Sequence, residues 1–355
     1  MNMKLLRSAI ALMMALLMVL SLGGCTMNKG TTWIAKSGEE TIPAGLYLLN
    51  VSSGYNTAVS VLEQMYLEDA ESVNLEDLWK NSLDGLSVDQ WITEETKESI
   101  VNYVAILNKF NELGFTFDEA DLMLIDQEVN NYWESDGDSY KQSGVSKDSV
   151  RKQVESRYRS RVIFDHIFGE GGEKEVSDDV LKQYYADNYT HIQYLSVSIK
   201  DKEGDELQQR KDLLDEAIKD ARAGGDFVAI LKELEHDVLT LSGTAKEDLP
   251  ERSDDHFDAV IYDSTEGYYP EELLTAVAEM DVDSYKVVTG ETELILVKKI
   301  DPMAEEEYFK ANRESILSAA MNGEFLEMVA EWGKTVEIEF NEKALKRYSA
   351  KNIVG

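Results

Sequence analysis

A β-strand pattern reads Gln193-Tyr194-Leu195-Ser196-Val197-Ser198-Ile199, and it follows a long series of segments with helical spacing. Over residues 191–199, apolar and polar side chains alternate, which is typical of a strand with one buried face. Two more strand patterns follow at residues 284–288 and 293–299, with helical spacing in between. One early strand, several helices and two late strands predict a small α+β domain.

Helical spacing dominates on both sides of this domain. Apolar residues recur at steps of three and four, and proline or serine often precedes such a segment while glycine follows it. Residues 31–42 suit a short hairpin, a helix is expected to begin near Pro43, and residues 336–340 suit a strand before a final charged helix that ends at Lys351. The spacing predicts helices over residues 55–70, 75–83, 88–113, 118–133, 145–168, 177–188, 206–223, 227–234, 271–279 and 304–334.

The N-terminus has the parts of an export signal, with Lys4 and Arg7 ahead of an apolar run over residues 9–20. This run is shorter than the roughly 20 residues that span a bilayer. Behind it comes Leu22-Gly23-Gly24-Cys25, which resembles the lipobox of bacterial lipoproteins and holds the only cysteine of the chain. We therefore interpret Cys25 as the site of lipid attachment; a short membrane anchor or an ordinary secretory signal are the alternatives.

The lipid interpretation places the working protein outside the cytoplasm. Residues 1–24 are then a signal peptide, residues 25–30 a tether, and two or more acyl chains on Cys25 make a stable anchor. A chain with one cysteine, which the lipid occupies, has no thiol left for a disulfide, a thiolate metal site or thiol catalysis.

The chain is strongly acidic, with 69 Asp and Glu residues against 35 Lys and Arg residues. This balance disfavours nucleic acids and anionic membrane surfaces as partners, because both attract clusters of lysine and arginine. Most of the acidic residues lie in helical patterns, where they indicate solvated faces.

Several motifs, taken in order, resemble the PrsA-type extracytoplasmic foldases of bacteria and their SurA-like relatives. The motifs extend over almost the whole chain that follows Cys25. They read Val176-Ser177-Asp178-Asp179, Tyr184-Tyr185-Ala186-Asp187-Asn188, Ala221-Arg222-Ala223-Gly224-Gly225-Asp226-Phe227, Leu234-Glu235-His236-Asp237, Glu272-Leu273-Leu274-Thr275-Ala276-Val277 and Val282-Asp283-Ser284-Tyr285-Lys286-Val287-Val288.

The resemblance implies an α+β protein in which a helical chaperone body surrounds an inserted parvulin-type prolyl isomerase domain. The body would comprise residues 31–188 and 302–355, and the insert residues 189–301. Such a protein would assist the folding of exported proteins at the outer face of the cell membrane, with unfolded or partly folded chains as its partners and no cofactor.

The isomerase residues that the resemblance implies are two buried histidines on neighbouring strands, a nearby cysteine or aspartate, and a Met/Phe pocket for the proline ring. Here Tyr194 to Ser196 occupy the first histidine position, Leu294 occupies the second, and only Ser242-Gly243 stands in for a glycine-rich turn. Both histidines are therefore missing, which predicts a weak or silent isomerase.

Few other residues offer replacement chemistry. The candidates are Tyr194, Asp237 and Met280; His236 beside Asp237 reads as a solvated loop pair, and Phe257 as packing. We find no metal-ligand spacing, phosphate-binding glycine loop or serine nucleophile motif. Three hypotheses remain: a foldase with a weak or silent isomerase domain, an active isomerase with a substituted site, and a surface lipoprotein that keeps the fold for adhesion or assembly.

Overall fold

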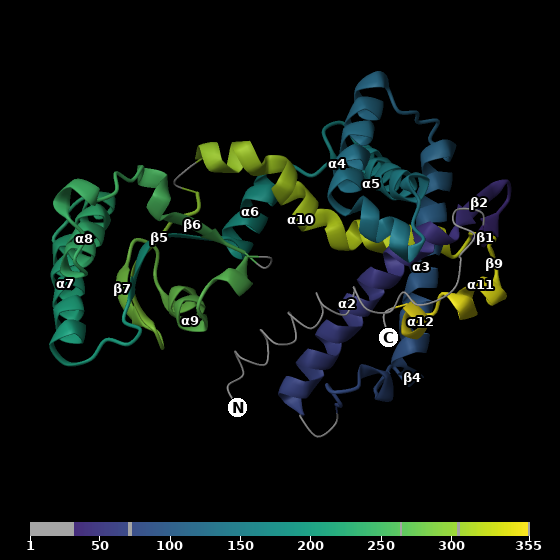
Figure 1. The fold of residues 1–355 in the computed structure, drawn as a ribbon. Helices are drawn as coiled ribbons and strands as arrows, with labels where there is room; N and C mark the ends of the chain where they lie inside the picture. Colours follow the sequence, from purple (N-terminus) through teal and green to yellow (C-terminus); the bar gives the residue numbers. More distant parts are fainter. Residues whose placement is uncertain (1–31, 70–72, 263–264, 304–305, 354–355) are drawn as a thin grey trace. The chain divides into compact units, whose positions relative to one another are not determined.

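The computed structural model describes residues 32–69, 73–262, 265–303 and 306–353, and the chain is an α+β protein (Figure 1). It divides into two compact units. The body unit comprises the chain up to Glu175 together with Asn322–Gly355, and the sheet unit is Val176–Met321. Cys25, the signal peptide and the tether lie outside the described residues.

The body unit is closed by strands from opposite ends of the sequence. β1 (Trp33–Ser37) pairs with β2 (Glu40–Pro43) as the predicted hairpin, and its other edge pairs with β9 (Glu339–Phe340). Asn341 extends this contact, because its backbone N–H donates to Ile34 O at 2.9 Å and its side chain donates to Trp33 O at 3.1 Å. Two short helices, α11 (Glu342–Arg347) and α12 (Ala350–Ile353), end the chain.

Four long helices form most of the body core: α2 (Ala44–Glu68), α3 (Val88–Glu112), α4 (Glu119–Ser143) and α5 (Lys147–Phe168). Capping boxes at Ser87 and Asp118 satisfy the first N–H groups of α3 and α4. Gly45 lets α2 and α5 approach closely, since a Cβ there would lie 2.3 Å from Ser149 Oγ. The last long helix, α10 (Glu306–Gly333), contributes its C-terminal part to the body unit.

Most of the predicted helices are confirmed, and α4 is longer than predicted. α4 runs ten residues beyond the predicted end at Trp133, because its polar second half still packs against α5 through Tyr140, and it ends where Gly144 adopts a left-handed φ of 87°. The prediction that Gly114 follows the end of α3 is correct, with φ of 72° at this glycine.

The helix predicted over residues 75–83 is wrong. This segment holds only a 3-10 turn, η1 (Leu78–Lys80), followed by a tight hairpin of β3 (Ser82–Leu83) and β4 (Leu86–Ser87). Asp84 and Gly85 both have positive φ at the turn, a conformation that a continuing α-helix excludes. The apolar spacing of the segment instead serves packing onto the body core, where Leu83 is buried and Leu75 and Leu78 are partly buried.

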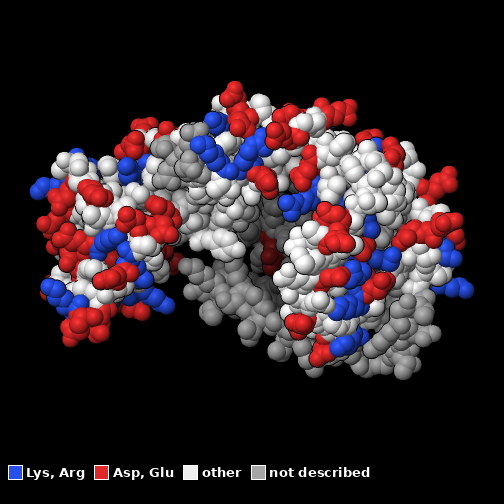
Figure 2. Space-filling model, turned by 90° about the horizontal axis from the view of Figure 1, so that it is seen from above, with Lys and Arg blue, Asp and Glu red and all other residues white. Residues whose placement is uncertain are grey.

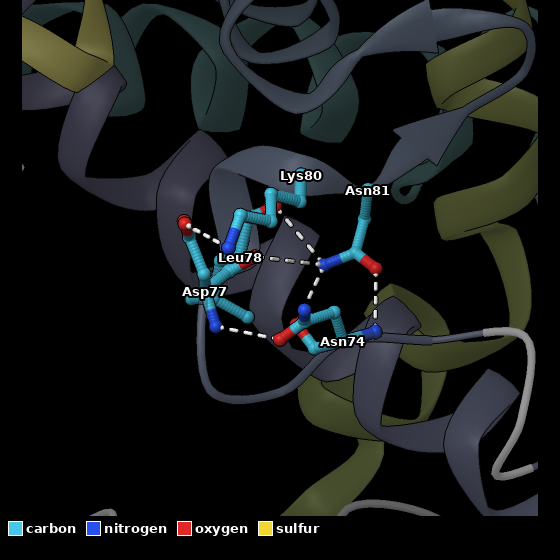
Figure 3. A network of polar contacts seen from close by, with 5 residues as sticks. All are labelled: Asn74, Asp77, Leu78, Lys80 and Asn81. Atoms are coloured by element: carbon cyan, nitrogen blue, oxygen red, sulfur yellow. Dashed lines mark hydrogen bonds and ion pairs between the residues drawn. The ribbon is translucent and has the colours of Figure 1, made fainter.

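One buried side chain holds this loop in place (Figure 3). Asn81 Nδ2 donates to Asn74 O at 2.8 Å and Leu78 O at 3.0 Å, and Asn81 Oδ1 accepts the Asn74 N–H at 2.7 Å. Asn74 Oδ1 in turn accepts the Asp77 N–H at 2.9 Å. The amide of Asn81 thus replaces the hydrogen bonds that a helix would have given these backbone groups.

The sheet unit is built on a four-stranded antiparallel sheet with the order β6-β5-β8-β7. Its strands are β5 (Thr190–Ser198), β6 (Asp258–Ile261), β7 (Tyr285–Thr289) and β8 (Glu293–Ile300); β6 is a strand that the sequence pattern did not predict. α7 (Gly204–Arg222) and α8 (Phe227–Leu241) pack on one face, and α9 (Glu271–Glu279) packs on the other.

The sheet unit is longer than the predicted insert at both ends. It also takes in α6 (Asp178–Asn188) and the first part of α10, which we had expected in the body. Arg313 Nε donates to Asp178 Oδ1 at 2.7 Å, and Tyr185 stacks on Tyr308 with ring centroids 5.9 Å apart. These contacts join the two flanking segments, α6 and the first part of α10, to each other.

No helix among the described residues is long and apolar enough to cross a membrane.

Replacement of Asn81 by alanine should lower the free energy of unfolding of the protein by about 2–3 kcal/mol, because it leaves buried backbone groups of the loop without partners. Asn111→Ala, which changes an exposed asparagine on α3, is the matched control and should alter the free energy by about 0.5 kcal/mol or less. Urea unfolding followed by circular dichroism measures both; equal effects would mean that the Asn81 network carries no stability.

Candidate functional site

The two positions where the resemblance places histidines lie on the central strands of the sheet unit. β5 and β8 pair along their whole length, with Val197 opposite Leu294 and Leu195 opposite Leu296. All four side chains face α7 and α8, where Leu294 is 2% exposed and Leu296 is fully buried. This face is a dry hydrocarbon layer that offers no proton donor or acceptor from the side chains at these positions.

Tyr194 and Met280 lie on the opposite face of the sheet, in the apolar cluster that α9 covers. The Tyr194 ring packs edge-on against Tyr269 with centroids 6.2 Å apart, and burial raises the pKa of the Tyr194 hydroxyl. Tyr194 therefore stays protonated near neutral pH and can donate a hydrogen bond. Met280 is buried in the same cluster.

Asp237 is an exposed residue on α8, on the far side of the sheet from Tyr194. Phe257 likewise belongs to the α7–α8 side, whereas Met280 belongs to the α9 side. The structure brings Tyr194 and Met280 together but keeps Asp237 and Phe257 apart from them. Met280 and Phe257 thus pack in different clusters, on opposite faces of the sheet.

The loop pair predicted for His236 and Asp237 is wrong, because both residues lie inside α8. The helix continues beyond the predicted end at Leu234 since Val238 extends the same buried face. His236 points to the segment after the helix, with its Nε2 2.8 Å from Pro250 O. This hydrogen bond pins the segment that leads to β6.

His191 is the buried histidine that the sequence analysis passed over. It is 6% exposed, its Nε2 hydrogen-bonds with the Tyr185 hydroxyl, and its ring meets Tyr185 and Tyr308 edge-on at centroid distances of 5.5 and 5.0 Å. Burial lowers the pKa of His191, against the opposing effect of Asp258 and Asp301. A neutral imidazole thus holds α6 and α10 against the start of β5. The density of tyrosines around residues 184–194 was the signal for this cluster.

An open groove of about 480 Å³ lies between α9 and the edge strand β7. One face of α9 contributes Glu271, Glu272, Thr275, Ala276 and Glu279, and β7 contributes residues 286–289. Glu271, Glu272 and Glu279 are exposed, and the one basic side chain of the lining is Lys286, whose Nζ lies 4.0 Å from Glu279 Oε2. The groove is acidic and borders an unpaired strand edge.

Among the described residues, no group of three or more His, Cys, Asp or Glu side chains is placed to hold a metal ion.

No family model matches the chain, and no curated protein matches it. The chain is similar to crystal structures of foldase proteins. That of foldase protein PrsA from Streptococcus pneumoniae is 15% identical over 75% of this chain and 96% of its own, with a TM-score of 0.36. PrsA from Lactococcus lactis is 15% identical over 90% of this chain and 98% of its own, with a TM-score of 0.34. PrsA from Bacillus subtilis is 18% identical over 74% of this chain and 93% of its own, with a TM-score of 0.29.

Proposed function

We propose that this chain is a lipid-anchored extracytoplasmic foldase that holds unfolded exported proteins, and that its sheet unit has little or no prolyl isomerase activity. The order of the sequence motifs supports the proposal. So does the division of the chain into a body unit made from both ends of the sequence and a sheet unit made from one continuous segment.

The observation that carries the chaperone part is an exposed apolar segment at the start of α4. Leu122, Met123 and Leu124 are consecutive and are 43%, 65% and 46% exposed, while Ile125 is fully buried and anchors the helix. Exposed apolar surface of this kind marks interaction sites, and methionine adapts to partners of many shapes. An unfolded chain offers the scattered apolar side chains that such a surface can bind.

Acidic side chains flank this apolar segment. Glu119 and Asp126 are exposed on the same helix, where Asp126 is ion-paired with Arg151. On the face shown in Figure 2, acidic and basic side chains are interspersed. An acidic rim favours the basic segments of a client and disfavours acidic ones. It also keeps the foldase molecules apart through the repulsion of like charges.

The isomerase part of the proposal rests on the two leucine positions. Rotation about a prolyl peptide bond in water must cross a barrier of roughly 18–20 kcal/mol, which an enzyme lowers with polar groups aimed at the twisted amide. Leu195 and Leu294 are hydrocarbon and face a packed helix layer, so they supply no such group. The sheet unit then serves to bind clients or to shape the surface that holds them.

Proline-peptide turnover by the whole mature protein should be about a hundredth or less of that of a twin-histidine parvulin in the same assay, because Leu195 and Leu294 cannot stabilise the twisted amide as polar side chains would. A chymotrypsin-coupled tetrapeptide assay measures it. Turnover equal to that of the parvulin would show that Tyr194 and its neighbours form a substituted active site, and Tyr194→Phe would then abolish it.

A triple change of Leu122, Met123 and Leu124 to serine should weaken the suppression of client aggregation by about tenfold in the concentration needed, because each side chain loses its apolar contact area. Light scattering of a chemically unfolded client measures this. The matched control changes Val180, Leu241 and Val282, three exposed apolar residues of the sheet unit, to serine. Equal loss in both variants would show that client holding does not depend on this segment of the body unit in particular.

Cys25→Ala should move the protein from the detergent phase to the aqueous phase or leave its signal uncleaved, because the only thiol that can carry the lipid is gone. Phase partitioning and the mass of the processed chain measure the two results. Partitioning equal to that of the natural protein would refute the lipid anchor.

A further inference from the structure

The outer edge of β7 is open to a further strand. β7 is the last strand of the sheet order, and among the described elements it pairs only with β8. Ser284 O accepts the Lys299 N–H at 3.1 Å, and the Gly290 N–H donates to Glu293 O at 2.9 Å. Since the bonding direction alternates along an antiparallel strand, Tyr285, Val287 and Thr289 direct their N–H and C=O groups away from β8. Such an edge is a template for strand addition.

The groove described above borders this edge, because residues of both α9 and β7 line it. Its α9 wall presents Glu271, Glu272 and Glu279 from one helix face, with Thr275 and the buried Ala276 between them. On the β7 side, Val288 is buried and lies at the groove floor. An added strand would therefore direct every second side chain toward three carboxylates across a small apolar floor.

We propose that this groove and the β7 edge bind an extended, basic segment of an unfolded client as a fifth strand of the sheet. The five residues of β7 span roughly 17 Å, which suits a client segment of about five residues. Main-chain hydrogen bonds to Val287 and Thr289 give affinity for any extended backbone, and pockets for alternate side chains give specificity.

The charge pattern defines which segments fit. In the bound client segment, the side chains that face α9 are lysine or arginine. Their methylene stems cover Ala276 and Val288, while their charged ends reach the carboxylates of α9. At the outer edge itself, the Arg222 guanidinium donates to Tyr285 O at 3.4 Å, so the added strand pairs with Val287 and Thr289 beyond this contact. A basic side chain of the client would be repelled by Arg222, so the side chains that face away from α9 are uncharged. The preferred client segment thus alternates basic and apolar residues. This proposal rests on the proposed foldase function and names the client segments that the sheet unit takes.

The test measures fluorescence anisotropy of a labelled peptide of alternating lysine and valine with the whole mature protein. Changing Glu271, Glu272 and Glu279 to glutamine should weaken binding by about tenfold, because three charge contacts are lost. The control variant removes the same net charge elsewhere, at three exposed acidic residues of α7 and α8. It changes Asp215 to asparagine and Glu216 and Glu233 to glutamine, and it should change binding by less than about twofold. If both triple variants weakened peptide binding equally, the peptide would be attracted to the overall charge of the protein, and the proposed binding site in the groove would be wrong.

Strand addition has its own readout. A version of the peptide with methyl groups on alternate backbone nitrogens cannot donate to the β7 carbonyls and should bind about tenfold more weakly. Val287→Pro removes an N–H group that points away from β8, and it removes no hydrogen bond to β8. This variant should bind the unmodified peptide about as weakly as the natural protein binds the methylated one. Unchanged binding of the methylated peptide would overturn the proposal, whether or not the proline variant folds. Aggregation suppression by the same proteins reports on the foldase function separately.

Discussion

The pairing of β1 with β9 is the contact on which the organisation of this chain depends. It joins residues near position 35 to residues near position 340, so the body unit cannot exist without both ends of the sequence. The chain must therefore leave the body after Glu175 and return to it at Asn322. This constraint explains how a second unit can sit inside the sequence of the first without interrupting its core, because the insertion falls between α5 and the C-terminal part of α10.

The central strands of the sheet unit are stabilised by buried hydrocarbon. Leucine and valine at the centre of β5 and β8 stabilise the contact with α7 and α8 through burial. Insertion of an imidazole there would bury a polar group among hydrocarbon, and such a group needs a hydrogen-bond partner to be tolerated. His191 meets this requirement through the Tyr185 hydroxyl, which shows that this unit does accept a buried histidine where a partner is built for it.

Periodicity predicted the long helices, the first hairpin and three strands of the sheet unit, because an element with one buried face has apolar residues at regular spacing in the sequence. It failed at residues 75–83, where apolar residues at helical spacing pack a loop that Asn81 holds, and the decisive hydrogen bonds join residues that no spacing rule connects. It missed β6, a four-residue strand whose pairing with β5 is a tertiary effect. For the candidate site, the loss of both histidines could be read from the sequence. The separation of Asp237 from Tyr194 could not, because it follows from which face of the sheet each helix covers.

The continuity of the sheet unit in the sequence has a consequence for the order of folding. A chain is made from its N-terminus, so all of Val176–Met321 is available before β9 has been synthesised. Contacts within this unit close loops of moderate length, whereas the β1–β9 contact closes almost the whole chain and pays the larger loop entropy. The sheet unit can therefore be complete while β1 still has a free edge. In the interval before β9 arrives, that edge is the most exposed pairing surface of the unfinished body.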